Sequence, residues 1–305
     1  MKSNQALLEF LKERIPEENI LLSEPMNRHT SFRIGGPAEI FVKVPTAKVL
    51  SEILLYFAQV SQNYFVLGKG SNLLVGDKGY RGVVLQLQEE MASIRIEGSR
   101  VIAGAGASLP LVAQTAAAQG LSGMEFAAGI PGSIGGAVVM NAGAYDGEMK
   151  QIVENVTVYN QMGEEMYLDN DTMEFGYRSS IIKDRPFVVT EVTLKLKEDK
   201  KEEILARMED FNARRRQKQP LEYPSGGSTF KRPEGYFAGK LIMDAGLRGL
   251  RVGDAQVSEK HCGFIVNIGN ASAEDVKELM EEVQYRVRKQ LGVRLEPEII
   301  MLGDF

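Results

Sequence analysis

The chain has 305 residues, of which 44% are hydrophobic and 25% charged, and its net charge is −5. This length and composition allow two or three domains with buried cores, which excludes a largely disordered protein. No apolar run approaches the roughly 20 residues of a membrane-spanning helix, and the acidic balance argues against a general nucleic-acid-binding protein.

Cysteine and histidine are scarce in this chain. The single cysteine, Cys262, excludes an internal disulfide, and with only His29 and His261 as further soft ligands we expect no metal site. The N-terminus mixes charged and apolar residues, so it lacks the uniform apolar segment of a signal peptide. These features favour a reducing compartment, and we expect a cytoplasmic protein.

The first part of the chain predicts a helix followed by a β-α-β unit. Residues Met1 to Ile20 are typical of an amphipathic helix. Thr46 is a suitable N-cap for the helical run 47–60, and apolar strands 40–44 and 64–67 flank this run.

The middle of the chain predicts three strands and one helix, followed by a mostly antiparallel sheet over residues 153–196. The helix covers residues 109–119, with Ser108 as its N-cap and Gly120 at its end. The predicted strands share alternating or Val-rich patterns and cover residues 83–87, 94–97, 100–103, 153–159, 165–168 and 187–196.

The last part of the chain predicts a smaller unit behind a charged helix. That helix covers residues 201–217, and Pro220 and Pro224 then mark a boundary. The spacing of Ser272 and Asp275 is typical of a capping box. The predicted elements after the boundary are helices over 236–245 and 273–291 and strands over 264–268 and 295–302.

Two glycine clusters are candidate nucleotide-binding loops. Residues 68–72 follow a predicted strand directly, so their backbone N–H groups could hold a pyrophosphate, although a tight turn would also explain them. The second cluster, 129–137, continues through 140–145, and its small residues allow close approach to a flat ligand or close packing. Neither cluster has the Rossmann or the Walker pattern.

Polar residues in three distant segments form a candidate catalytic set. Arg178 could hold a carboxylate, Ser228 could deliver a proton and Glu298 could support that transfer. A surface cation, a turn residue and an ion-pair partner are the ordinary alternatives, and sequence alone does not bring the three together. A basic run at 214–218 could place one or two cations against a diphosphate.

Taken together, these motifs resemble those of the UDP-N-acetylenolpyruvoylglucosamine reductases over almost the whole chain. The motifs that carry the resemblance are residues 29–36, 68–74, 129–145, 175–179, 218–220, 227–233 and 295–299. The chain lacks the extra segment after the arginine that carries a substrate-covering tyrosine in the longer form of this family. It therefore looks like the shorter form.

The resemblance implies an α+β fold and a flavoenzyme. A vanillyl-alcohol-oxidase-type (PCMH-type) FAD-binding domain in two α+β lobes, residues 1–75 and 76–219, would precede a smaller α+β substrate-binding domain, residues 220–305. The enzyme would hold FAD non-covalently and take a hydride from NADPH. It would then reduce the enolpyruvyl group of UDP-N-acetylglucosamine enolpyruvate to give UDP-N-acetylmuramate, a peptidoglycan precursor, and we expect a monomer.

The resemblance also assigns roles to individual residues. The implied catalytic residues are Arg178, Ser228 and Glu298. The implied substrate contacts are Tyr177, Lys218 and Lys231. The implied FAD contacts are Arg33, Ile34, Gly35, Gly68, Gly70, Ser71, Asn72, Gly129, Pro131, Gly132, Ser133, Gly136, Asn141 and Ala142.

Two other functions remain open at this stage. An FAD-dependent oxidase of the same fold would use oxygen and often carries FAD tethered to His or Cys, for which His29 and His261 offer few candidates. A nucleotide-binding regulatory protein without turnover would explain the glycine clusters but not the late Ser228 and Glu298 motifs.

Overall fold

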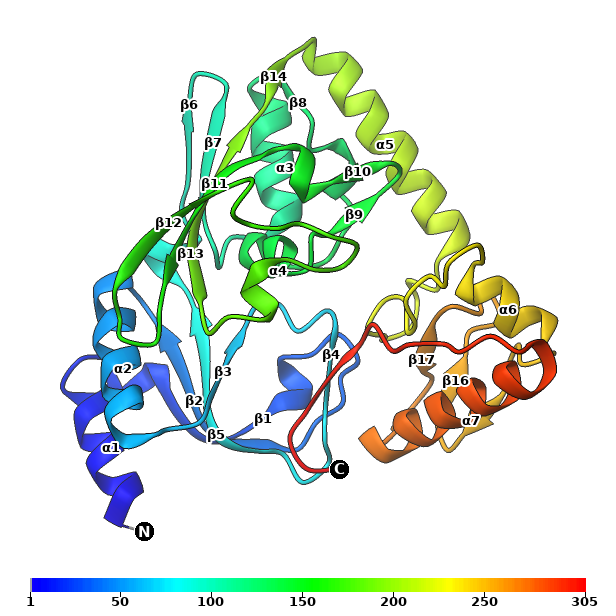
Figure 1. Ribbon diagram of the computed structural model, residues 1–305, viewed down its shortest axis with the longest axis horizontal. Coiled ribbons are helices and arrows are strands. Elements are labelled where there is room, and N and C mark those ends of the chain that lie inside the picture. Colours follow the sequence, from blue (N-terminus) through cyan, green and yellow to red (C-terminus); the bar gives the residue numbers. More distant parts are fainter. Residues whose placement is uncertain (1) are drawn as a thin grey trace. The chain divides into compact units, whose positions relative to one another are not determined.

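The computed structural model describes residues 2–305, with side chains from residue 5 onward, and it divides into two compact units (Figure 1). Unit 1 comprises Met1–Leu22, Ile40–Lys69 and Gly82–Ala213. Unit 2 comprises Ser23–Glu39, Gly70–Arg81 and Arg214–Phe305. Two separate clusters of buried apolar side chains form the cores.

The N-terminal helix is shorter than the sequence pattern predicts. Helix α1 (Lys2–Lys12) buries Leu7 and Leu11, but strand β1 (Ile20–Pro25) follows after one 3-10 turn, η1 (Glu17–Asn19). The prediction of a helix up to Ile20 is therefore wrong in its second half. Pro16 has no backbone N–H to donate and thus cannot continue the helix.

The predicted β-α-β elements are present in a four-stranded sheet of order β1-β2-β5-β3. Helix α2 (Ala47–Val60) begins as predicted, since the Thr46 hydroxyl accepts a hydrogen bond from the Val49 N–H at 3.2 Å. Strand β5 lies between β2 and β3 and runs parallel to β3. The strands after β1 are β2 (Pro37–Val44), β3 (Tyr64–Leu67) and β5 (Tyr80–Leu87).

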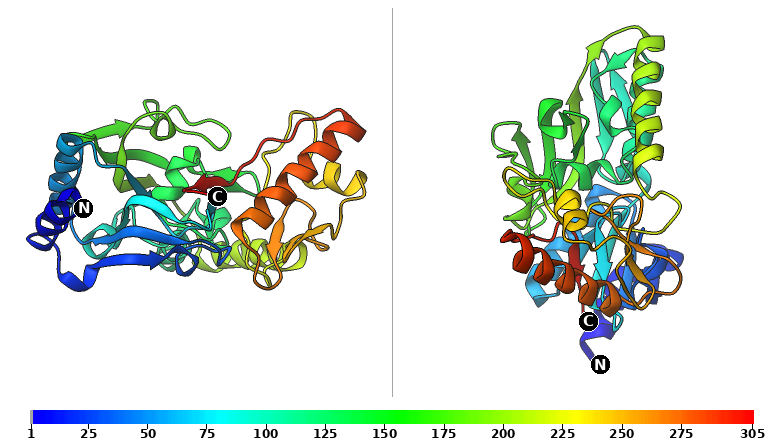
Figure 2. Two further views of the ribbon diagram at one scale, coloured as in Figure 1. Left: turned by 90° about the horizontal axis from the view of Figure 1, so that it is seen from below. Right: turned by 90° about the vertical axis from the view of Figure 1, so that its right-hand side faces the viewer.

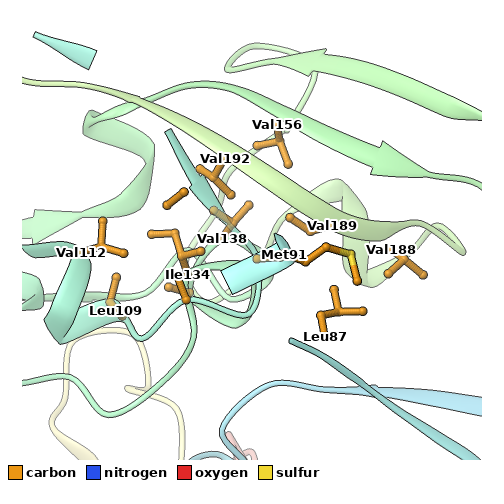
Figure 3. Close-up of a cluster of buried hydrophobic side chains, with 14 of the residues drawn as sticks. Leu87, Met91, Leu109, Val112, Ile134, Val138, Val156, Val188, Val189 and Val192 are labelled. Carbon is orange, nitrogen blue, oxygen red and sulfur yellow. The ribbon is translucent and has the colours of Figure 1, made fainter. Parts of the chain in front are cut away.

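Unit 1 also contains a five-stranded sheet of order β12-β11-β13-β7-β6, whose neighbours all pair antiparallel. This antiparallel pairing was predicted for β11, β12 and β13. Helices α3 (Leu109–Ala118) and α4 (Ile134–Val139) pack against this sheet, and Val138 of α4 lies beside Val192 of β13 (Figure 3). The strands are β6 (Ile94–Glu97), β7 (Arg100–Gly104), β11 (Val153–Tyr159), β12 (Glu165–Asp169) and β13 (Val188–Lys195).

Short elements complete unit 1. Two pairs of two-residue strands are β8 (Leu121–Ser122) with β14 (Lys197–Glu198) and β9 (Gly143–Ala144) with β10 (Gly147–Glu148). The 3-10 turns are η3 (Glu89–Ala92), η4 (Glu125–Ala127), η5 (Met149–Gln151) and η6 (Ile181–Lys183). Helix α5 (Lys201–Lys218) starts in unit 1 and ends in unit 2.

Unit 2 places the long helix α7 (Ala273–Leu291) against a three-stranded sheet (Figure 2). Ser272 and Asp275 form the predicted capping box, and Gly292 ends the helix in the left-handed conformation. The final strand is shorter than predicted, because Ile300–Leu302 (β18) pairs with β4 (Leu73–Val75), whereas Pro297 makes an isolated bridge to Phe230. The other elements are η2 (Met26–Arg28), α6 (Ala238–Asp244), β15 (Arg251–Val252), β16 (Ala255–Val257) and β17 (Ile265–Asn267).

The structure confirms the α+β class. Within residues 2–305, no helix has the length and apolar character needed to cross a membrane.

Candidate functional site

The two glycine clusters approach each other at Gly68 and Ser133 in unit 1. A Cβ atom on Gly68 would lie 2.5 Å from the Ser133 hydroxyl oxygen, closer than real Cβ atoms come to any neighbour. The Ser133 hydroxyl accepts a hydrogen bond from the Gly136 N–H at 3.3 Å and thereby caps α4. Glycine at position 68 therefore lets the loop after β3 pack directly on the start of α4.

Helix α4 itself was not predicted from the sequence, in which the whole second cluster has the composition of a loop. The segment before the helix is held by backbone bonds, because Gly132 O accepts from Leu109 N at 2.9 Å and Ile134 N donates to Ala107 O at 2.9 Å. Gly129 and Pro131 lie directly upstream of this held segment.

The first glycine cluster also offers unused donors. Gly70 is buried, and among the described residues its N–H and that of Ser71 have no hydrogen-bond acceptor. Gly70 has a φ of +61°, and a Cβ there would lie 2.0 Å from the carbonyl oxygen of His29. Buried backbone N–H groups normally have partners, and consecutive N–H groups without them form anion-binding sites. This donor set fits the pyrophosphate of FAD.

Arg178 lies at the tip of a tight turn in unit 1. Gly176 and Ser179 exchange two backbone hydrogen bonds at 3.1 and 3.3 Å, and Arg178 has a left-handed φ of 54°. Its guanidinium Nη2 donates to Gly143 O at 3.2 Å, and the guanidinium carbon lies 5.2 Å from the ring centroid of Tyr177. Tyr177 is exposed, so the turn presents a cation and an aromatic ring together.

Asn141 and Ala142, two predicted FAD contacts, directly follow α4. Asn141 is only 1% exposed and has a left-handed φ of 42°. Its side chain bonds to three groups of unit 1: Glu148 Oε2, Gly176 O and Lys150 N. Ala142 N donates to Ala137 O at 2.8 Å.

Unit 2 brings the neighbours of Ser228 and Glu298 into contact. Glu298 N donates to Thr229 O at 2.9 Å, so the residue after Ser228 is bonded to Glu298. Asn72 Nδ2 donates to Glu298 O at 3.0 Å, and Ile300 N donates to Asn72 O at 3.0 Å. A predicted FAD-loop residue therefore holds the segment that carries Glu298. Ser228 is exposed, whereas Thr229 is buried and anchors the loop through Ile265 N.

The predicted substrate lysines of unit 2 lie near this loop and at the end of α5. Lys231 Nζ pairs with Glu296 at 3.3 Å, and Lys231 N donates to Glu296 O at 2.8 Å. Lys218 is exposed at the last position of α5. Next to it, Gln219 Oε1 is buried without a hydrogen-bond partner among the described residues, which is unusual for a buried acceptor. Gln219 belongs to the motif 218–220, but its residue type alone indicated no role.

Arg33, Ile34 and Gly35 line an open hollow of about 670 Å³ within unit 2. Arg33 has a left-handed φ of 56°. The lining also includes Tyr223 and Asn270. The structure therefore groups these three predicted FAD contacts, while their contact with FAD stays a prediction.

Comparison with known proteins matches both parts of the chain to described domains. Residues 38–168 match an FAD binding domain, and residues 219–302 match the C-terminal domain of UDP-N-acetylenolpyruvoylglucosamine reductase. The reductase of that name from Agathobacter rectalis is 49% identical, over 99% of this chain and 100% of the relative. The one from Caldanaerobacter subterraneus is 48% identical over 98% and 99%.

The chain belongs to the UDP-N-acetylenolpyruvoylglucosamine reductase family. The crystal structure of the Thermus caldophilus reductase superposes with a TM-score of 0.81 at 42% identity and covers 93% of this chain and 98% of that one. As a member of this reductase family, the protein is an FAD-dependent oxidoreductase of peptidoglycan precursor synthesis. The family resemblance inferred from the motifs is thereby confirmed.

Proposed function

We propose that the chain reduces the enolpyruvyl double bond of UDP-N-acetylglucosamine enolpyruvate with NADPH to give UDP-N-acetylmuramate. The observation that carries this proposal is the 49% identity to a named reductase along the full length of both chains. The residues assigned below fit this reaction, and each assignment is a proposal.

The cofactor would lie against the glycine clusters. Bound FAD would supply the hydride transfer from NADPH to the terminal carbon of the substrate's vinyl group. Gly70 and Ser71 would donate backbone N–H groups to its pyrophosphate, and the packed loop pair of Gly68 and Ser133 would support that contact. The three-part division into residues 1–75, 76–219 and 220–305 remains part of this proposal.

Arg178 would bind the substrate's carboxylate. A guanidinium can donate two parallel N–H bonds to a carboxylate, and a preorganised cation stabilises the negative charge that develops beside the reacting double bond. The Gly143 carbonyl and the Tyr177 ring limit the positions that this guanidinium can take. Little reorganisation is then needed when the charge develops.

Ser228 would give the proton that completes the reduction. A serine hydroxyl is a weak acid, so it needs help from a neighbouring charged group. Glu298 would give that help, since its backbone is bonded to Thr229, the residue that follows Ser228. The exposure of Ser228 leaves its hydroxyl accessible to a substrate.

The remaining assignments concern the sugar nucleotide and the cellular setting. Lys218 and Lys231 would bind the diphosphate of the substrate, and Tyr177 would contact the substrate beside Arg178. We further propose that the enzyme works in the cytoplasm as a monomer.

An anaerobic spectroscopic titration tests the proposed function. NADPH should bleach the flavin absorbance of the holoenzyme, and the enolpyruvyl substrate alone should restore it. Ser228→Ala should slow the restoring step by about 10²–10⁴-fold while leaving bleaching nearly unchanged. Rapid reoxidation by oxygen without any effect of the substrate would instead favour the oxidase.

A further inference from the structure

The last residue of α4 and the short segment after it hold the Arg178 turn at three points of unit 1. The Val139 carbonyl accepts a hydrogen bond from the Ser180 hydroxyl at 2.8 Å. Asn141 Nδ2 donates to Gly176 O at 2.9 Å. The Gly143 carbonyl accepts from the guanidinium itself at 3.2 Å. Both ends of the turn and its arginine are thus tied to residues 139–143.

The Asn141 amide is occupied by protein partners. An asparagine side chain has two N–H donors, and here Nδ2 bonds to Gly176 O at 2.9 Å and Glu148 Oε2 at 3.2 Å. Its Oδ1 accepts from Lys150 N at 2.9 Å. Because the residue is also only 1% exposed, its side chain has no donor left for a cofactor or a substrate.

Left-handed backbone conformations concentrate around this contact. Asn141 and Arg178 have φ values of 42° and 54°, and Tyr145 and Asp146, at the tip of the β9–β10 hairpin, have 51° and 65°. Such conformations of non-glycine residues persist where the surroundings hold them, and they are common at functional sites.

The tip of the β9–β10 hairpin also packs against helix α5. The Tyr145 ring stacks on Phe211 of α5, with centroids 4.6 Å apart and planes 5° from parallel. The hairpin carries Gly143, whose carbonyl bonds to Arg178, and Glu148, which bonds to Asn141. The stack therefore fixes the support on which the arginine rests.

We infer that Asn141 is a positioning residue for Arg178, acting on the reaction through the Gly176 carbonyl and not through contact with FAD. This inference rests on the proposed role of Arg178. The sequence motif implied that the Asn141 side chain contacts FAD. We instead assign this side chain a role in orienting the guanidinium.

Loss of this support should slow only the step that uses Arg178. A displacement of about 1 Å at a reacting group can cost on the order of 10²-fold in rate. Asn141→Ala should therefore slow the substrate-dependent return of flavin absorbance by about that factor. Bleaching by NADPH and the amount of bound FAD should stay close to wild type.

Two variants and a double mutant test the inference in the holoenzyme. Asn141→Asp keeps the side-chain shape and the acceptor for Lys150 N but removes both donors. It should therefore slow the substrate-dependent step as Asn141→Ala does, and it keeps the test valid if the alanine variant folds poorly. Asn160→Ala is the matched control, because Asn160 also makes several side-chain bonds, within the β11–β12 turn. In an Arg178→Lys background, Asn141→Asp should add little further slowing, since coupled residues are non-additive.

The outcomes separate this inference from the proposed function. If Arg178→Lys does not slow the substrate step, the proposed role of Arg178 fails and the inference with it. If Arg178→Lys slows that step but Asn141→Asp does not, the inference alone is wrong. The inference would also be overturned if the rate losses of Arg178→Lys and Asn141→Asp were fully additive, or if both Asn141 variants lost FAD. The inference is supported if Asn141→Asp slows the substrate step, if it adds little slowing to Arg178→Lys, and if Asn160→Ala reacts at nearly the wild-type rate.

Discussion

The contact between Gly68 and Ser133 allows a quantitative prediction for Gly68→Ala. The new Cβ would lie 2.5 Å from the Ser133 hydroxyl oxygen but 3.6 Å from its Cβ, so only the hydroxyl is in the way. Rotating the serine side chain removes the clash, yet it breaks the bond to the Gly136 N–H that caps α4. A serine cap contributes about 1 kcal/mol, and we expect Gly68→Ala to lower the free energy of unfolding by about that amount.

The same reasoning predicts strong coupling with Ser133→Ala. This substitution removes the hydroxyl, so it should also cost about 1 kcal/mol as a lost cap. Once the hydroxyl is gone, the Cβ at position 68 meets only an ordinary contact. The double mutant should therefore lose about 1 kcal/mol and not the sum of about 2 kcal/mol.

Urea unfolding of the apoproteins measures this coupling, because without FAD the unfolding free energy contains no term for cofactor binding. Gly98→Ala is a control for the loss of a glycine, since no atom lies within 4 Å of a Cβ there, although its φ of +58° adds a backbone cost. If Gly68→Ala costs the same with and without the Ser133 hydroxyl, the steric reasoning is wrong.

Three further predictions concern buried charge, a perturbed tyrosine and a helix cap. Burial raises the pKa of Glu125, but hydrogen bonds from Arg207 and from the Gly123 N–H outweigh it, so the net pKa lies below the usual 4.5. A carboxyl with a lowered folded pKa contributes stability above pH 4.5, and this stability is lost as the pH falls through the folded value. In urea unfolding, Glu125→Gln should flatten this acid dependence and lower the free energy of unfolding by about 1–3 kcal/mol at neutral pH. Burial and the hydrogen bond to Glu165 raise the pKa of Tyr159 to about 12. An absorbance titration of Tyr159→Phe should therefore differ from wild type only near that pH, and a difference near pH 10 would contradict the assignment. Asp77 accepts hydrogen bonds from Ala273 N at 2.8 Å and Glu274 N at 3.1 Å. Asp77→Ala should therefore lower the free energy of unfolding by about 1 kcal/mol and speed amide exchange at the start of α7. Asp184 is exposed, and Asp184→Ala should do neither.

Local patterns in the sequence determined most elements of secondary structure. Thr46 and the Ser272–Asp275 pair mark helix starts because their side chains bond backbone groups only three residues away. The alternation in 153–159 and 165–168 likewise predicted neighbouring antiparallel strands, which the structure confirms. The combined motifs also identified the family, because several weak signals in one order are specific together.

Two helices differ from the sequence-based expectation for identifiable reasons. The end of α1 was readable at Pro16, but the mixed charged and apolar pattern extended the prediction past it. Helix α4 has two glycines directly after Ile134, and glycine is a poor helix former. The helix forms because Ser133 caps it and because Ile134 and Val138 are buried in the core of unit 1 (Figure 3).

Only the tertiary structure decided how the site residues are supported. The bond from Asn72 to Glu298 joins residues 226 positions apart, and the bond from Asn141 to Gly176 joins residues 35 positions apart. Such contacts leave no periodic signal, since each depends on where separate strands and turns lie in the folded unit. The motifs named Asn141 as a cofactor residue, whereas its buried, bonded amide in the fold points to the arginine turn.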